Sequence, residues 1–136
     1  MNITVDLRQI GPSTAEASVR RHRVRVDRPG NKGGADEGMM GGEYLLVGLG
    51  GCFTSNLLAA IAARQADVRD VRVQVVGTLA SAPSRFSEVE LTVWARTEDR
   101  ALLSKLVEIA DRGCISANTL RGAVALTVTV AEPAPT

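Results

Sequence analysis

Alternation of apolar and polar side chains predicts β-strands near both ends and in the middle of the chain. At the start, Ile3, Val5 and Leu7 alternate with polar residues, as in a strand with one buried face. The same period of two predicts further strands within residues 17–29, 71–79, 87–95 and 124–130. Residues 80–86 are predicted to join the two central strands as a hairpin loop. Residues 31–42 contain five glycines and no periodicity, which predicts a long loop of the kind that is usually functional or mobile.

Apolar segments with a helical pattern lie between these strands. The longest runs from about Glu43 to Gln65. A second helix is predicted after Thr97, a suitable N-cap, and it ends at Gly113, which can take the left-handed position after a helix. CISANTLR (114–121) is a candidate for a short third helix. Strands and helices are grouped rather than alternated, which predicts one α+β domain over residues 1–136, with largely antiparallel sheets.

The composition narrows the range of partners. Only 3% of the residues are aromatic, so the core is expected to be aliphatic, and the net charge of +1 provides no long-range attraction to nucleic acid or a membrane surface. Residues 44–63 are uncharged and long enough to cross a bilayer, but glycines and polar residues at their centre favour a helix buried on nearly all sides. The presence of only two cysteines and no signal-peptide pattern indicates a cytoplasmic protein with free thiols.

GLGGCFTSNLL (48–58) places three glycines beside the thiol of Cys52, inside the long predicted helix. Each glycine costs about 1 kcal/mol of helix propensity relative to alanine, so we expect close packing or a bound small molecule to compensate. Gly48, Gly50 and Gly51 are expected to open an apolar cleft around Cys52. A lone cysteine in an apolar helix is nevertheless more often an inert core residue than a nucleophile.

Cys114 opens the short predicted helix, where backbone N–H groups would stabilise a thiolate. From the residues alone, Cys114 is therefore expected to have the lowered pKa, and Cys52 to be the more buried thiol. If the two meet, a structural pair, a redox pair and a metal site all remain open. A metal site is the weakest of these, because His22 is the only imidazole, is expected on the surface, and no CxxC motif is present. No metal or other cofactor is expected.

Two motifs together resemble the OsmC/Ohr family of hydroperoxide-reducing proteins, which comprises the osmotically inducible protein C and organic hydroperoxide resistance groups. They are GGEYLLVGLGGCF (41–53) and CISANTLRGAVALTV (114–128). HRVRVDRPGNKGG (22–34) and SRFSEVELTVWA (84–95) extend the resemblance over nearly the whole chain. The resemblance implies an α+β fold with mostly antiparallel sheets wrapped around central helices. It also implies an intertwined homodimer with its sites at the dimer interface.

The resemblance implies a thiol-dependent peroxidase. Cys52 would attack an organic hydroperoxide and become a sulfenic acid, and Cys114 would resolve that acid as a disulfide. A dithiol, a lipoylated protein or a small thiol would then restore the pair. The aliphatic residues of the long helix would favour organic hydroperoxides over hydrogen peroxide.

Two departures from the organic-hydroperoxide pattern place the chain closer to the broader OsmC-like branch. That pattern has an Asn-Pro-Glu whose glutamate stands ten residues before the first cysteine, whereas here Gly42 occupies that position. Glu43 stands nine residues before Cys52, as is usual in the broader branch, and no proline directly precedes it. The arginine that activates the thiolate in the family has no secure match, and Arg8, Arg20 and Arg21 are the candidates.

Three classes of function therefore compete. The first is the peroxidase, and the second is a non-enzymatic OsmC-like dimer with incidental thiols and a small-ligand-binding or structural role. The third is nucleic-acid binding through the arginines between positions 20 and 28. Asp27 within that run, the near-neutral charge and the few aromatic residues argue against it.

Overall fold

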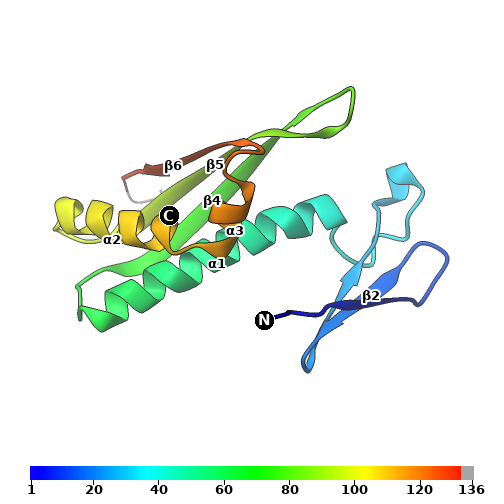
Figure 1. Cartoon of the computed structure of the whole chain (residues 1–136), viewed down its shortest axis with the longest axis horizontal. Coiled ribbons are helices and arrows are strands. Elements are labelled where there is room, and N and C mark those ends of the chain that lie inside the picture. Colours follow the sequence, from blue (N-terminus) through cyan, green and yellow to red (C-terminus); the bar gives the residue numbers. More distant parts are fainter. Residues whose placement is uncertain (133–136) are drawn as a thin grey trace. The chain divides into compact units, whose positions relative to one another are not determined.

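The computed structural model describes residues 1–132 and divides into two compact units. The N-terminal unit comprises Met1–Leu45, and the C-terminal unit begins at Leu46. The elements follow the order β1–β2–β3, α1, β4–β5, α2–α3 and β6, with one short 3-10 helix, η1 (Gly30–Lys32), before α1 (Figure 1). Each unit contains one three-stranded sheet, and the combination of these sheets with helices confirms the predicted α+β class. That residues 1–136 form a single domain stays a prediction.

The N-terminal sheet is an antiparallel meander of β1 (Asp6–Gln9), β2 (Ala15–Val19) and β3 (His22–Val26). Residues 17–29 were expected to form one strand, and this prediction is wrong because a two-residue turn at Arg20 and Arg21 divides them. Arg20 has a left-handed φ of 54°. Such turns usually carry glycine, asparagine or aspartate, so an arginine pair gave no signal.

The glycine-rich loop is anchored to the end of β3 by a buried carboxylate. Asp27 accepts hydrogen bonds from the Thr14 hydroxyl (2.7 Å) and from the N–H groups of Arg28 (2.7 Å) and Glu37 (3.2 Å). These donors, Thr14 above all, outweigh the opposing effect of burial and hold the pKa of Asp27 well below its usual range. Gly34 approaches the Arg28 backbone so closely that any side chain there would collide with it.

The long helix α1 spans Gly41–Ala63, so it begins and ends two residues earlier than predicted. Its start is capped by Glu43, whose Oε1 accepts a hydrogen bond from the Met40 N–H (2.8 Å), as the glutamate of a capping box does. The Tyr44 hydroxyl donates to the carbonyl oxygen of Arg25 (2.7 Å) and ties the first turn to β3.

Only one side of α1 is buried, so the expectation of a helix buried on nearly all sides is wrong for a single chain. Its buried residues are Leu49, Gly50, Phe53, Leu57 and Ala60. Leu45, Val47 and Leu58 remain 47%, 49% and 50% exposed. By length and composition alone, α1 could cross a membrane. In a water-soluble fold, this apolar surface would need a cover that the described residues do not supply.

The C-terminal sheet has the order β4–β5–β6. β4 (Arg69–Ala80) and β5 (Arg85–Arg96) form the predicted hairpin, whereas β6 (Ala125–Val130) runs parallel to β5. The parallel pairing follows from the helical connection through α2 (Arg100–Arg112) and α3 (Ile115–Leu120), which returns the chain to the same end of the sheet. Asp99, not the predicted Thr97, caps α2, and it accepts a hydrogen bond from the Leu102 N–H (2.9 Å).

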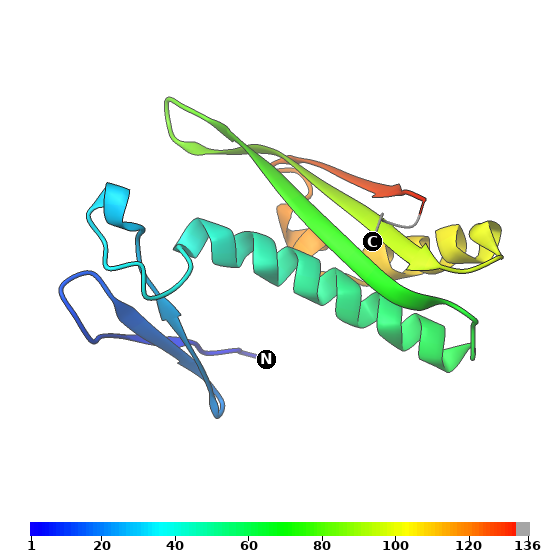
Figure 2. The same ribbon diagram turned by 180° about the vertical axis from the view of Figure 1, so that it is seen from behind.

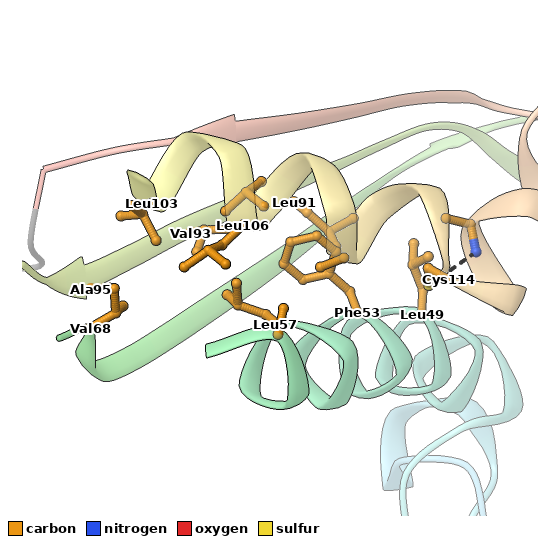
Figure 3. Close-up of a cluster of buried hydrophobic side chains, with 14 of the residues drawn as sticks. Leu49, Phe53, Leu57, Val68, Leu91, Val93, Ala95, Leu103, Leu106 and Cys114 are labelled. Atoms are coloured by element: carbon orange, nitrogen blue, oxygen red, sulfur yellow. Dashed lines mark hydrogen bonds between the residues drawn. The ribbon is translucent and has the colours of Figure 1, made fainter. Parts of the chain in front are cut away.

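The core of the C-terminal unit lies between one face of this sheet and helices α1 and α2. Figure 2 shows both helices on the same side of the sheet. Alternate residues of β5 are buried on that side, namely Val89, Leu91, Val93 and Ala95. Figure 3 shows Phe53 and Leu57 of α1 pointing toward this strand and toward Leu106 of α2. The predicted aliphatic core is confirmed, with Phe53 as its one fully buried aromatic ring among the described residues.

Candidate active site

Two free thiols meet in the C-terminal unit, one on α1 and one at the junction of α2 and α3. Cys52 lies on α1 and is half-buried, whereas Cys114 is fully buried among the core residues. Cys114 is the N-cap of α3, and its Sγ accepts a hydrogen bond from the Ala117 N–H at 3.4 Å (Figure 3). The two thiols also lie close enough that each shifts the pKa of the other. The fold thus brings together two thiols that the sequence leaves far apart.

The surroundings of Cys52 lower the pKa of its thiol. The largest cause is a hydrogen bond from the backbone N–H of Ser116, and partial burial opposes it. The Cys114 thiol, the N–H of Ile115 and the Ser116 hydroxyl lower the pKa further. Every one of these donors belongs to the segment that opens α3, so the N–H groups at the start of this helix stabilise the thiolate of Cys52.

Burial raises the pKa of Cys114, although the N–H groups of Ala117 and Ser116 act in the opposite direction. The nearby sulfur of Cys52 raises it further. The sequence-based expectations are therefore reversed: Cys52 has the lowered pKa, and Cys114 is the more buried thiol. They were wrong because the start of α3 directs N–H groups at a sulfur on another helix, while Cys114 itself points into the core.

Ser116 is the residue of this site that the sequence did not indicate. It supplies both an N–H group and a hydroxyl to the Cys52 sulfur, and its Oγ also donates to the carbonyl oxygen of Gly48 at 3.4 Å. Its position two residues after Cys114 carries no local signal, since its role depends on a contact with a helix more than sixty residues earlier.

An apolar groove lies between α1 and β4. It has a volume of about 580 Å³, and Cys52 is not among its lining residues, which are Leu46, Val47, Gly50, Gly51, Thr54 and Ser55 of α1 and Val73 and Val75 of β4. The expected cleft around Cys52 is therefore misplaced. Of the three glycines, only Gly50 is closely packed, because a Cβ there would lie 2.7 Å from the Val75 Cγ2. Nothing among the described residues lies within 4 Å of a Cβ at Gly48 or Gly51.

The arginines considered as activators of the Cys52 thiolate lie in the N-terminal unit. Arg8 is on β1, and Arg20 and Arg21 form the turn between β2 and β3. The groups that shift the pKa of Cys52 come instead from the C-terminal unit. Glu43 serves as the cap of α1, and His22 is exposed on β3, as predicted.

Comparisons with known proteins identify the fold. The family model described as OsmC-like protein matches residues 33–129. An OsmC-like protein from Mycoplasma pneumoniae has a similar structure, with a TM-score of 0.85 at 17% identity over 98% of this chain and 99% of that one. None of the curated proteins matches the chain.

Two organic hydroperoxide resistance proteins have the same fold. The one from Elizabethkingia anophelis has a TM-score of 0.76 at 20% identity over 97% of this chain and 96% of that one. The one from Bacillus subtilis has a TM-score of 0.68 at 18% identity over 96% and 98%. The TM-scores establish a common fold despite the low identities, and the family model spans most of the sequence, including both cysteines. The chain belongs to the OsmC-like protein family.

Proposed function

We propose that this protein is a thiol-dependent peroxidase that reduces organic hydroperoxides, with Cys52 as the attacking thiol and Cys114 as the resolving thiol. The observation that carries the proposal is the opposite pKa shift of two adjoining thiols, lowered for Cys52 and raised for Cys114. A lowered pKa increases the thiolate fraction at neutral pH, and the thiolate is the form that attacks a peroxide. The resemblance to organic hydroperoxide resistance proteins supports the substrate class.

The Cys52 thiolate attacks the terminal oxygen of the hydroperoxide and breaks the O–O bond. The sulfur becomes a sulfenic acid, and the alkoxide leaves as an alcohol after taking up a proton. The Cys114 thiol then attacks the sulfenic sulfur, its proton leaves with the hydroxide as water, and the disulfide forms. An external dithiol or lipoylated protein supplies two electrons and two protons to restore both thiols.

The raised pKa of Cys114 fits the resolving role. A buried, protonated thiol reacts slowly with peroxide, so Cys114 stays reduced until Cys52 has been oxidised. Its position against Cys52 then favours disulfide formation over further oxidation of the sulfenic acid by a second peroxide.

The exposed apolar surface of α1 supports a homodimer as the working form. Leu45, Val47 and Leu58 would be covered if a second copy packed along this helix. Analytical ultracentrifugation at micromolar concentration should give about twice the chain mass of 14.4 kDa. A clean monomer under these conditions would contradict the dimer.

Turnover of cumene hydroperoxide with dithiothreitol as reductant tests the function. We expect the wild-type protein to consume peroxide and Cys52→Ser to lose activity. Cys114→Ser should react once and then become over-oxidised at Cys52. Ser104→Ala, a change at an exposed residue of α2, serves as the matched control and should retain wild-type turnover. Undiminished activity in Cys52→Ser would refute the assignment, and an inactive wild type with unreactive thiols would favour the non-enzymatic alternative.

A further inference from the structure

We propose that Asn56 is a positioning residue that holds Cys114 within reach of Cys52. This inference rests on the proposed function, since it concerns the step in which the two thiols form a disulfide. It is carried by the hydrogen bonds that join α1 to the corner between α2 and α3, defined here as residues 110–118.

The α2–α3 corner is rigid within itself. The Asn118 Nδ2 donates to the carbonyl oxygen of Arg112 at 3.0 Å, across the break between the two helices. Arg121 pairs with Asp111 and so links the end of α3 to the end of α2. The Cys114 sulfur caps α3 itself. A displacement of the corner relative to α1 would therefore carry Cys114 with it.

Two side-chain hydrogen bonds hold this corner against α1. The Asn56 Nδ2 donates to the carbonyl oxygen of Ala110 at 3.3 Å, and the Ser116 Oγ donates to that of Gly48 at 3.4 Å. On α1, Gly48 lies four residues before Cys52 and Asn56 lies four residues after it. The two attachments thus flank Cys52, about one helical turn to either side.

The bond from Asn56 satisfies a carbonyl group that α2 itself leaves free. The helical partner of the Ala110 oxygen would be the Cys114 N–H, which donates instead to Asp111 (3.2 Å). The Asn56 amide also lies against the turn at Gly113, where its Nδ2 is 3.5 Å from the position of a Cβ. Asn56 therefore contacts the last turn of α2, directly before Cys114 in the sequence.

Substitution of Asn56 tests the positioning of Cys114 separately from the stabilisation of the Cys52 thiolate. Ser116 acts on both, because it contacts Gly48 and also lowers the pKa of Cys52. Asn56 is not among the main groups that shift the pKa of either thiol. Its removal should alter how readily the disulfide forms while the pKa of Cys52 stays unchanged, a combination that a general loss of stability would not produce.

The test is the redox equilibrium of the folded protein with glutathione, in which the protein dithiol and one glutathione disulfide give the protein disulfide and two glutathione thiols. Loss of one hydrogen bond should lower this equilibrium constant about 2- to 12-fold in Asn56→Ala, within the range for a single bond. Asn56→Gln, which keeps the amide donor, should recover part of the loss. Ser104→Ala, at an exposed residue of α2, is the control and should behave as wild type. The pKa of Cys52, followed by its alkylation rate against pH, should be the same in all four proteins.

An equilibrium constant unchanged in Asn56→Ala would overturn the proposal, as would an equal fall in Ser104→Ala. A shifted pKa of Cys52 in Asn56→Ala would also contradict it, because Asn56 would then act on the thiolate. If Asn56→Ala does not fold, Asn56→Ser provides the same comparison with a hydroxyl on a shorter side chain. Failure of the proposed function is distinguishable, because a wild-type protein that reduces no peroxide can still show the predicted change in the glutathione equilibrium.

Discussion

Substitution of Gly48, Gly50 or Gly51 by alanine should show that close packing requires a glycine at residue 50 but not at residues 48 and 51. A Cβ at residue 50 would lie 2.7 Å from the Val75 Cγ2, and this methyl would have to retreat by about 0.7 Å to restore an ordinary contact of 3.4 Å. Val75 is β-branched and restricted at χ1, so the strain passes to the backbone of α1 or β4.

The magnitude follows from two opposing terms. Replacing a helical glycine by alanine gains about 1 kcal/mol of helix propensity. Overpacking at residue 50 costs about 1–3 kcal/mol, so Gly50→Ala should be neutral or destabilising by up to about 2 kcal/mol. Gly51→Ala meets nothing within 4 Å and should stabilise the protein by about 1 kcal/mol. The two variants should therefore differ by about 1–3 kcal/mol.

Urea unfolding of both variants at one protein concentration gives this difference directly. The double variant Gly50→Ala with Val75→Ala removes the colliding methyl and should show a favourable coupling between the two sites. Equal stabilisation by Gly50→Ala and Gly51→Ala would refute the packing argument. Destabilisation by Gly51→Ala would show instead that a second copy fills the space beside it.

Three further substitutions test individual side chains. Ser116→Ala removes the hydroxyl but keeps the backbone N–H, so the pKa of Cys52 should rise and its alkylation at neutral pH should slow; an unaltered alkylation profile would exclude the hydroxyl. Asp27→Asn should lower the free energy of unfolding at neutral pH. Because the pKa of Asp27 is lowered in the folded state, the difference in stability from wild type should be complete above about pH 4 and should disappear as the pH falls below it. A difference that does not depend on pH would contradict this. Glu43→Ala should cost about 0.5–1.5 kcal/mol of stability with peroxide turnover retained, and Glu43→Gln should restore the cap; a loss of turnover in both would instead make Glu43 part of the reaction.

Local sequence patterns were sufficient to predict most of the helices and strands. Period-two alternation located the long hairpin of β4 and β5, and the apolar run located α1 to within two residues. The division of β2 from β3 was missed because Arg20 and Arg21 carry no turn signal. Thr97 is a suitable N-cap by residue type, but the helix begins later and Asp99 is its cap.

The chemistry of the two thiols could not be predicted, since it depends on contacts between distant segments. The sequence places N–H groups next to Cys114, but in the fold those of Ser116 and Ile115 point at Cys52. The burial of Cys114 depends in the same way on the packing of α1 against α2. Glycine content gave the right expectation of close packing, but only the fold distinguishes Gly50 from its neighbours.

The exposed side of α1 carries apolar side chains that a single chain leaves uncovered. Its exposed apolar residues, Leu45, Val47 and Leu58, are where a second copy would be expected to pack. Cys52 and Cys114 already lie close to each other within one chain, so dimerisation is not needed to bring the two thiols together.

The most direct measurement is mass-spectrometric mapping of both cysteines after the reduced protein has reacted with one equivalent of cumene hydroperoxide. If Cys52 and Cys114 act as one redox pair, a single disulfide between them should form within one chain, and it should be absent from both single-cysteine variants. Two unmodified thiols, or a bridge that only links separate chains, would contradict the account.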